Sequence, residues 1–429
     1  MIRGAEYLFQ LFSLAFSVVV FSSCMESSVM VDSNEISKVL FDSIPKQKVD
    51  EPSLYDKETK VGAAALNKYL HLLKGKRVGI VGNQTSVIDS TFLVDTLISL
   101  GVDVRILFAP EHGFRGDHDA GENVKHGHDS KTGLKIFSLH GKTKKPTKES
   151  LDSVDVILFD IQDVGARFYT YISTLHYVME AAAEDNKQVI VLDRPNPNAH
   201  YVDGPVLDTN FRSFVGMHPV PVVYGMTIGE YGKMINGEYW MKDSLQANYT
   251  VIPLENWTYD KEYVLPIAPS PNLPNQLSIY LYPSLCFFEG TEVSVGRGTE
   301  FPFQVWGHPN ADCEALDHFS FKPVSMPGKS KYPKHENKIC RGFDFRVYPK
   351  DSIRKHLKLD PSIVLEAKEC VKSEKEFFNR VSFFNLLAGT DKFVNQLKQN
   401  VSAEEIKRSW QLDLDQFKLI REKYLIYKK

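Results

Sequence analysis

The chain has 429 residues, 43% hydrophobic and 24% charged, which is ordinary for a globular protein and long enough for two domains. Its formal net charge of −3 at pH 7 gives no electrostatic reason to expect nucleic acid or an anionic membrane surface as a partner. The sequence shows no fixed-period repeat and no low-complexity segment, so a repeat architecture is not expected.

The first 24 residues are typical of a bacterial lipoprotein signal peptide. Arg3 precedes a mostly apolar stretch, residues 8–21, that is too short to span a bilayer comfortably. The stretch ends in Phe21-Ser-Ser-Cys24, which resembles a lipobox. We therefore expect lipidation of Cys24 and a lipid-anchored protein of the cell envelope that faces the periplasm. An ordinary signal peptide with an incidental cysteine is the alternative.

The composition divides the rest of the chain into three parts. Residues 25–58 are polar and aperiodic, as expected of a tether. Residues 59–240 alternate expected strands with expected helices, which predicts βαβ units and a Rossmann-like parallel sheet. Residues 241–429 mix short strands and helices, which predicts a smaller α+β domain.

The elements expected in the first domain can be placed from periodicity and from glycine positions. Helices are expected at 63–73, 91–100, 173–184 and 227–236, and strands at 77–82, 102–108, 135–139, 154–159 and 188–192. In the second domain we expect strands at 249–254 and 343–348 and helices at 374–387 and 403–424. Residues 266–275 contain four prolines and cannot form a regular element.

Three expected strands end in charged residues. The strand 102–108 leads to Glu111, the strand 154–159 to Asp160, and the strand 188–192 to Asp193. The carboxyl ends of parallel strands lie at one edge of a sheet, where α/β proteins bind ligands. This arrangement favours an enzyme with its active site at that edge.

Glu111 is the strongest candidate for a catalytic acid. Pro110 fixes the backbone before it, and the flanking Phe108 and Phe114 could desolvate the carboxyl group and raise its pKa. The alternative is a carboxylate that caps a following helix. In the same loop, Glu122 is the best partner carboxylate.

The sequence argues against a bound nucleotide or cofactor. Gly82-Asn-Gln-Thr85 follows the first strand where a dinucleotide site would have G-x-G-x-x-G, and no P-loop motif is present. Residues 117–129 are rich in His and Asp but lack fixed metal-ligand spacing, so a solvated loop is favoured over a metal site. The four cysteines after Cys24 match no zinc pattern, and their pairing cannot be deduced.

Further polar residues near the strand ends could bind a sugar. Arg167 could hold a carboxylate, and Tyr169 and Tyr171 could stack on a sugar or hydrogen-bond it; half-buried packing is the alternative for the tyrosines. The pair formed by Asp193 and Arg194 could equally be an internal salt bridge. In the second domain the candidates are Asn272, Asn275, Glu292 and Arg297, with a braced surface loop as the alternative.

Several motifs together resemble the exo-β-N-acetylmuramidase (NamZ) family, long known as a domain of unknown function, DUF1343. They are Gly82–Thr85, Ala109–Gly116, Phe159–Ile172, Leu192–Pro197, Asp203–Pro205, Ser270–Asn275, Phe288–Thr291 and Gly296–Thr299. The resemblance extends from about residue 66 to the C-terminus. It implies a Rossmann-like domain beside a smaller domain, with the active site in the cleft between them. It also implies an exo-acting glycoside hydrolase that releases N-acetylmuramic acid from non-reducing ends of peptidoglycan fragments.

The resemblance assigns roles to the candidate residues. Glu111 becomes the acid at the leaving oxygen. The second role stays open between Glu122, Glu292, Asp160 and the acetamide of the substrate. An arginine would bind the lactyl carboxylate, and amides would bind the acetamide. The expected substrate-binding residues are Asn83, His112, Arg115, Gln162, Asp163, Arg167, Tyr169, Tyr171, Asp193, Arg194, Asn196, Asn272, Glu292 and Arg297.

Two other functions are compatible with the sequence. A lipoprotein that captures muropeptides without cleaving them would use the same cleft, because fold alone does not decide function. A metal-dependent hydrolase would use the His- and Asp-rich loop. A chromogenic N-acetylmuramic acid glycoside separates the three, because a binder leaves it intact and a metalloenzyme loses activity in chelator.

Overall fold

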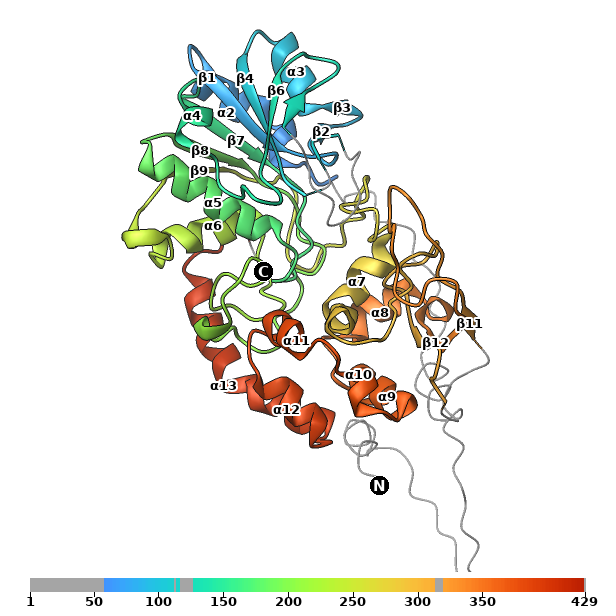
Figure 1. The fold of residues 1–429 in the computed structure, drawn as a ribbon. Helices are drawn as coiled ribbons and strands as arrows, with labels where there is room; N and C mark the ends of the chain where they lie inside the picture. The colour runs from blue at the N-terminus through green and yellow to red at the C-terminus, as the bar shows by residue number, and fades with distance from the viewer. Residues whose placement is uncertain (1–57, 112, 116–125, 313–318, 428–429) are drawn as a thin grey trace, which may run out of the picture.

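A computed structural model describes residues 58–111, 113–115, 126–312 and 319–427 (Figure 1). Three predicted site residues lie outside these ranges. They are Cys24, the expected lipidation site, His112, which was expected to bind substrate, and Glu122, a candidate catalytic residue. No helix within the described ranges is long and apolar enough to cross a membrane. Cys286 and Cys340 are buried free thiols, and Cys370 is disulfide-bonded.

The first domain is built on a seven-stranded sheet with the order β5-β6-β4-β1-β7-β8-β9. Its strands are β1 (Arg77–Gly82), β4 (Asp103–Ala109), β5 (Gly127–His128), β6 (Lys135–Ser138), β7 (Val156–Asp160), β8 (Gln188–Leu192) and β9 (Asn248–Ile252). All pairs are parallel except β5 with β6. Without β5, the six parallel strands have the order 3-2-1-4-5-6 of a Rossmann fold. The predicted fold class is therefore confirmed.

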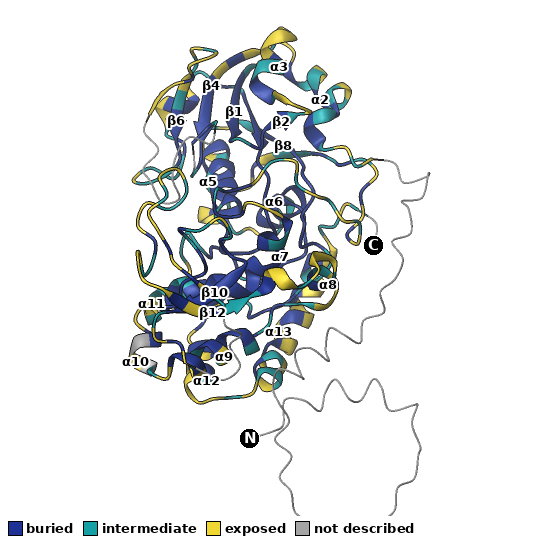
Figure 2. Ribbon diagram, turned by 90° about the vertical axis from the view of Figure 1, so that its right-hand side faces the viewer, coloured by how far each residue is buried: buried dark blue, intermediate teal, exposed yellow. Residues whose placement is uncertain are grey.

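Successive strand residues pack on opposite faces of this sheet. Ile80 packs into one hydrophobic cluster with α2 (Leu66–Leu73) and α3 (Leu93–Ser99). Val81 packs into the other cluster, with α5 (Tyr171–Glu184) and α6 (Ile228–Gly237). This alternation explains why the strands are nearly continuous apolar runs, because both faces of the sheet are covered. Figure 2 shows the central strands and the inner side of α5 as buried.

The second domain combines helices with a three-stranded sheet in the order β10-β12-β11. The strands are β10 (Val305–His308), β11 (Ser320–Phe321) and β12 (Cys340–Asp344). The helices are α7 (Gln276–Leu285), α8 (Lys350–His356), α9 (Ser362–Val371), α10 (Glu374–Phe377), α11 (Val381–Ala388), α12 (Lys392–Lys398) and α13 (Ala403–Glu422). The smaller elements of the first domain are β2 (Val87–Ile88), β3 (Thr91–Phe92) and α4 (Lys148–Leu151).

The sheet continues beyond the boundary expected at residue 240. Strand β9 pairs with β8 along its whole length, from Gln188↔Asn248 to Leu192↔Ile252, so it belongs to the first domain. Residues 238–247, around the expected boundary, connect α6 to β9. The expected helix 374–387 is two helices, α10 and α11, and the expected strand 343–348 ends at Asp344 in a 3₁₀ turn.

The C-terminal segment returns to the first domain. Helix α13 leads back toward α6 (Figure 1), and Arg421 donates a hydrogen bond from Nε to the Gly225 carbonyl at 3.0 Å. The Tyr427 hydroxyl donates to the Asp193 carboxylate and accepts a hydrogen bond from the Leu254 backbone at 3.0 Å. Asp193 is fully buried at the end of β8. The last described residue therefore completes the hydrogen bonding of a carboxylate in the first domain.

We expect Tyr427→Phe to lower the free energy of unfolding by about 1.5–3 kcal/mol, because it removes a donor from a buried carboxylate. Urea denaturation measures the change. The matched control is Tyr424→Phe, whose hydroxyl donates at 2.6 Å to Glu238, a side chain that is 24% exposed. Water can replace that bond, so the control should lose about 1 kcal/mol or less. Equal losses in the two variants would contradict this account of the C-terminal segment.

Candidate active site

The strand order of the sheet reverses at β1, and the ends of the neighbouring strands meet there. The chain runs outward from β1 through β4 to β6 and then crosses back to β7 on the other side of β1; open α/β sheets bind ligands at such a point. Asn83 follows β1, Glu111 follows β4, and Asp160 ends β7. The predicted convergence of the strand ends is present in the structure.

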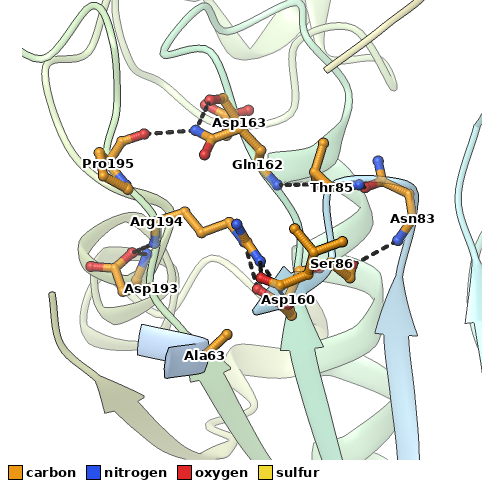
Figure 3. A network of polar contacts seen from close by, with 12 residues as sticks. Ala63, Asn83, Thr85, Ser86, Asp160, Gln162, Asp163, Asp193, Arg194 and Pro195 are labelled. Atoms are coloured by element: carbon orange, nitrogen blue, oxygen red, sulfur yellow. Dashed lines mark hydrogen bonds and ion pairs between the residues drawn. The ribbon is translucent and has the colours of Figure 1, made fainter. Parts of the chain in front are cut away.

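Asp160 and Arg194 form a buried ion pair at this edge (Figure 3). Arg194 donates from Nε to Oδ1 at 2.6 Å and from Nη2 to Oδ2 at 2.9 Å. The two residues are 0% and 4% exposed, and Arg194 also donates to the Val87 carbonyl at 3.2 Å. An Asp160 carboxylate held in this way has no free face for a substrate. The geometry supports the internal salt bridge rather than the predicted catalytic and substrate-binding roles.

The polar residues around this pair brace the strand ends (Figure 3). Gln162 donates from its backbone to Thr85 Oγ1 at 3.0 Å and from Nε2 to the Pro195 carbonyl at 2.6 Å. Asn196 donates to the Met226 carbonyl at 2.7 Å.

Asp163 accepts hydrogen bonds from the Gly165 backbone and the Tyr224 hydroxyl, and burial raises its pKa to about 6. Asp193 accepts from Thr227 Oγ1 and the Gly229 backbone at the start of α6. These contacts stabilise the strand ends, whereas Gln162, Asp163 and Asn196 were predicted to bind the substrate.

Like Arg194, two more of the four candidate arginines are held by contacts within the protein. Arg167 is fully buried, and it donates to the carbonyls of Pro205, Val220 and Leu387 at 2.6–2.9 Å. Burial lowers the pKa of its guanidinium to about 9. Arg115 forms a bidentate pair with Asp129, at 2.5 and 2.8 Å. The predicted substrate contact of Arg167 is replaced by a structural role, because its guanidinium is enclosed by protein.

A pocket of about 80 Å³ lies between the two domains beside Glu111. The first domain contributes the start of α5, and the second contributes α7 and the loop around Arg297. The proline-rich segment 269–274 forms the wall between them. The residues that line the pocket are Glu111, Phe168, Tyr169, Thr170, Tyr171, Ser270, Asn272, Leu273, Tyr282, Arg297 and Phe303.

Glu111 and Arg297 bring opposite charges to this pocket. Thr170 Oγ1 donates a hydrogen bond to Glu111 Oε2 at 3.4 Å. Arg297 pairs through Nε with Glu289 Oε1 at 2.9 Å, and its guanidinium lies 5.1 Å from the centre of the Phe303 ring. The Nη atoms of Arg297 make no hydrogen bond to any described residue. Arg297 is therefore the one candidate arginine that both lines the pocket and has donors to spare.

Hydrogen bonds within the protein orient the side-chain amides of Asn272 and Asn83. Asn272 donates from Nδ2 to the Lys329 carbonyl at 2.8 Å, which leaves its Oδ1 as an acceptor for the pocket. Asn83 donates from Nδ2 to the Tyr171 hydroxyl at 2.8 Å. Tyr169 and Tyr171 are 8% and 2% exposed, so the packing alternative holds for their rings although both line the pocket.

Some predicted residues lie elsewhere, and some lining residues were missed. Glu292 is not among the pocket-lining residues, and its carbonyl accepts a hydrogen bond from His335 at 2.6 Å. In the parts of the chain that are described, no three His, Cys, Asp or Glu side chains gather as a metal site requires. Thr170 was missed although it lies between two predicted tyrosines. Tyr282 and Phe303 carry no local signal, because only the packing of the second domain brings them to the pocket.

Comparisons with known proteins agree on one family. The profile for the N-terminal domain of exo-beta-N-acetylmuramidase NamZ matches residues 78–277, and that for the C-terminal domain matches residues 280–427. The peptidoglycan beta-N-acetylmuramidase NamZ of Bacillus subtilis (strain 168) is 38% identical over 377 residues, which cover 84% of this chain and 89% of that protein.

Two crystal structures of DUF1343 family proteins from Bacteroides fragilis NCTC 9343 are similar over most of the chain. One is 43% identical with a TM-score of 0.80, and covers 87% of this chain and 100% of its own. The other is 31% identical with a TM-score of 0.72, and covers 86% of this chain and 99% of its own. Both domains and their arrangement are thus shared with these structures.

We expect Arg194→Met to lower the free energy of unfolding by about 3–5 kcal/mol, because it leaves Asp160 buried without its partner. Adding Asp160→Asn to the same chain should recover part of this loss, since the stranded charge is then removed. Urea denaturation compares the variants, and folding of the double variant alone would support the same conclusion. A double variant less stable than Arg194→Met would contradict it.

Proposed function

This chain belongs to the exo-beta-N-acetylmuramidase NamZ family, and we propose that its interdomain pocket releases N-acetylmuramic acid from the non-reducing ends of peptidoglycan fragments. The chain is a glycoside hydrolase of peptidoglycan turnover, as the identity over both domains indicates. The observation that carries the proposal for the pocket is that Glu111 and Arg297 line one small cavity between the two domains.

Glu111 is the proposed general acid. In its protonated form the carboxyl group gives its proton to the glycosidic oxygen while the bond from that oxygen to C1 breaks. A water molecule then adds its hydroxyl group to C1, and the proton that the water loses goes to the Glu111 carboxylate. The buried aromatic residues Phe168 and Tyr171 line the same pocket as this carboxyl group.

Two of the candidates for the group that acts opposite Glu111 are poorly placed for that role. Asp160 is locked in its ion pair, and Glu292 does not line the pocket. Of the four candidates that the sequence left open, we retain Glu122, which lies outside the described residues, and the acetamide of the substrate. In the second case the acetamide oxygen attacks C1 as the leaving group departs, and water later opens the resulting ring.

Arg297 is the proposed partner of the lactyl carboxylate. This carboxylate distinguishes N-acetylmuramic acid from N-acetylglucosamine, and a guanidinium with free donors is suited to bind it. Asn272 Oδ1 is the matching acceptor for the acetamide N–H. The pocket thus offers a separate group for each of the features that define this sugar.

The envelope location is part of the proposal. The lipobox-like Phe21-Ser-Ser-Cys24 supports a lipid anchor on Cys24, and residues 25–58 would tether the folded domains to the membrane. A periplasmic enzyme that needs no nucleotide or other cofactor fits a compartment in which nucleotides are scarce. Labelling with a radioactive fatty acid, compared between the wild type and Cys24→Ala, tests the anchor.

We expect Glu111→Gln to lower kcat at least about a hundredfold on a chromogenic N-acetylmuramic acid glycoside while binding is kept, because it removes only the transferable proton. Release of the chromophore measures the rate, and calorimetry measures product binding. The matched control is Glu292→Gln, the same change outside the pocket lining, which should keep wild-type kcat. Near wild-type turnover by Glu111→Gln would refute the assignment, and an inactive wild type would refute the function itself.

We expect Arg297→Met to raise KM for the N-acetylmuramic acid glycoside and to lower its kcat/KM about ten- to a hundredfold, because a charged hydrogen bond to the lactyl group is lost. The corresponding N-acetylglucosamine glycoside should be a poor substrate for both proteins and should change little. Arg346→Met serves as control, because Arg346 pairs with Asp344 outside the pocket lining. An equal loss of kcat/KM on the two glycosides would show that Arg297 does not recognise the lactyl group.

A further inference from the structure

The Tyr171 hydroxyl at the pocket wall belongs to a hydrogen-bond chain that no step of the proposed reaction uses. The chain consists of Asn83, Tyr171, Tyr169 and the Pro269 carbonyl. It connects the end of β1 with the start of α5 and with the proline-rich segment. All three side chains are less than 9% exposed, so their hydrogen bonds cannot be exchanged freely with water.

The orientation of the Asn83 amide is fixed by its neighbours. Asn83 Oδ1 accepts hydrogen bonds from the Thr85 backbone at 2.9 Å and from Thr85 Oγ1 at 2.6 Å. A backbone N–H can only donate, so the atom facing it must be the amide oxygen. The amide nitrogen therefore faces Tyr171, and the Tyr171 oxygen is an acceptor in this contact.

Among the described residues, the proton of the Tyr171 hydroxyl has only weak hydrogen-bond acceptors. Its distance to the Pro269 carbonyl is 3.5 Å, at the limit of a hydrogen bond. That carbonyl already accepts hydrogen bonds from Tyr169 at 2.8 Å and from Gln84 at 3.0 Å. The Tyr171 hydroxyl is also hydrogen-bonded to the Tyr169 hydroxyl, so a phenol oxygen is its other acceptor. A carbonyl oxygen bound in the pocket would be a stronger acceptor than a phenol.

The Tyr171 hydroxyl also stays protonated. Burial raises its pKa, and the charge of Glu111 raises it further. The pocket therefore presents a neutral donor beside Glu111 at any pH at which the enzyme works. Across the same pocket, Asn272 Oδ1 is an acceptor. One donor and one acceptor are the complement of a secondary amide, which has one C=O and one N–H.

We propose that Tyr171 is a specificity-determining residue whose hydroxyl donates a hydrogen bond to the acetamide carbonyl of the sugar, and that Asn83 is the positioning residue that directs it there. The inference rests on the proposed function and names the part of the substrate that this side of the pocket binds. No proton is transferred, since Tyr171 only shares its hydrogen. The lactyl carboxylate and the acetamide are then recognised by different residues, Arg297 and Tyr171.

The test combines enzyme variants with a change in the substrate. Tyr171→Phe is compared with the wild type on the aryl glycoside of N-acetylmuramic acid and on its analogue with a hydroxyl group in place of the acetamide. We expect Tyr171→Phe to lower kcat/KM roughly tenfold on the acetamido substrate, because one hydrogen bond is lost, and to change it less than about twofold on the analogue. If the analogue reacts too slowly, inhibition constants of the two free sugars give the same comparison.

Asn83→Asp provides an independent test. This change keeps the shape of the side chain but replaces the amide donor by an acceptor, which should draw the Tyr171 proton away from the pocket. The variant should therefore behave like Tyr171→Phe, and the double variant should be no worse than either single variant. Tyr280→Phe is the matched control, because its buried hydroxyl donates to Glu262 outside the pocket lining. Circular dichroism and urea denaturation establish that each variant is folded.

The outcomes distinguish this inference from the proposed function. A wild type that leaves the acetamido glycoside intact would overturn the function, and the inference with it. If the wild type is active but Tyr171→Phe lowers kcat/KM equally on both substrates, or on neither, the inference alone is overturned. Strictly additive losses in the double variant would overturn the positioning role of Asn83.

Discussion

The buried ion pair between Asp160 and Arg194 holds together the edge of the sheet at which Rossmann-like folds bind their ligands. It ties the end of β7 to Arg194, two residues after β8, and Arg194 also binds the Val87 carbonyl of β2. In nucleotide-binding relatives of the fold a phosphate group would approach this edge. Here the side chains of Asp160 and Arg194 lie at this edge and bind each other. The binding pocket lies instead toward Glu111 and the second domain.

A second constraint is the fixed arrangement of the two domains. Arg167 connects the first domain to the Leu387 carbonyl of α11, and Arg421 of α13 reaches back to the Gly225 carbonyl. Each guanidinium satisfies backbone acceptors that would otherwise be buried without partners. Because such contacts are costly to break, the walls of the pocket are held in place before a substrate arrives. A preorganised site loses less free energy to reorganisation when it binds.

The strand ends could be predicted from the sequence, whereas the use of each polar residue could not. Apolar runs fix where β4, β7 and β8 end, and the topology of parallel strands brings these ends together. The four arginines look alike in sequence, but Arg167 binds a carbonyl 220 residues away and Arg297 binds Glu289 only eight residues away. Similarly, the pairing of Asn83 with Tyr171 spans 88 residues. Long-range partners decide whether a charged side chain braces the fold or faces a ligand.

The return of the C-terminus to the first domain has a consequence for the order in which the protein matures. Asp193 and Glu230 belong to the first domain, yet they accept hydrogen bonds from the Tyr427 side chain and from the backbone of Ile426. These donors lie 196 and 234 residues further along the chain than the carboxylates that they bind. The strands of the sheet are synthesised earlier, but the two buried carboxylates gain their full set of partners only after residue 427 has been made. Truncation before residue 426 would therefore weaken the domain that is synthesised first.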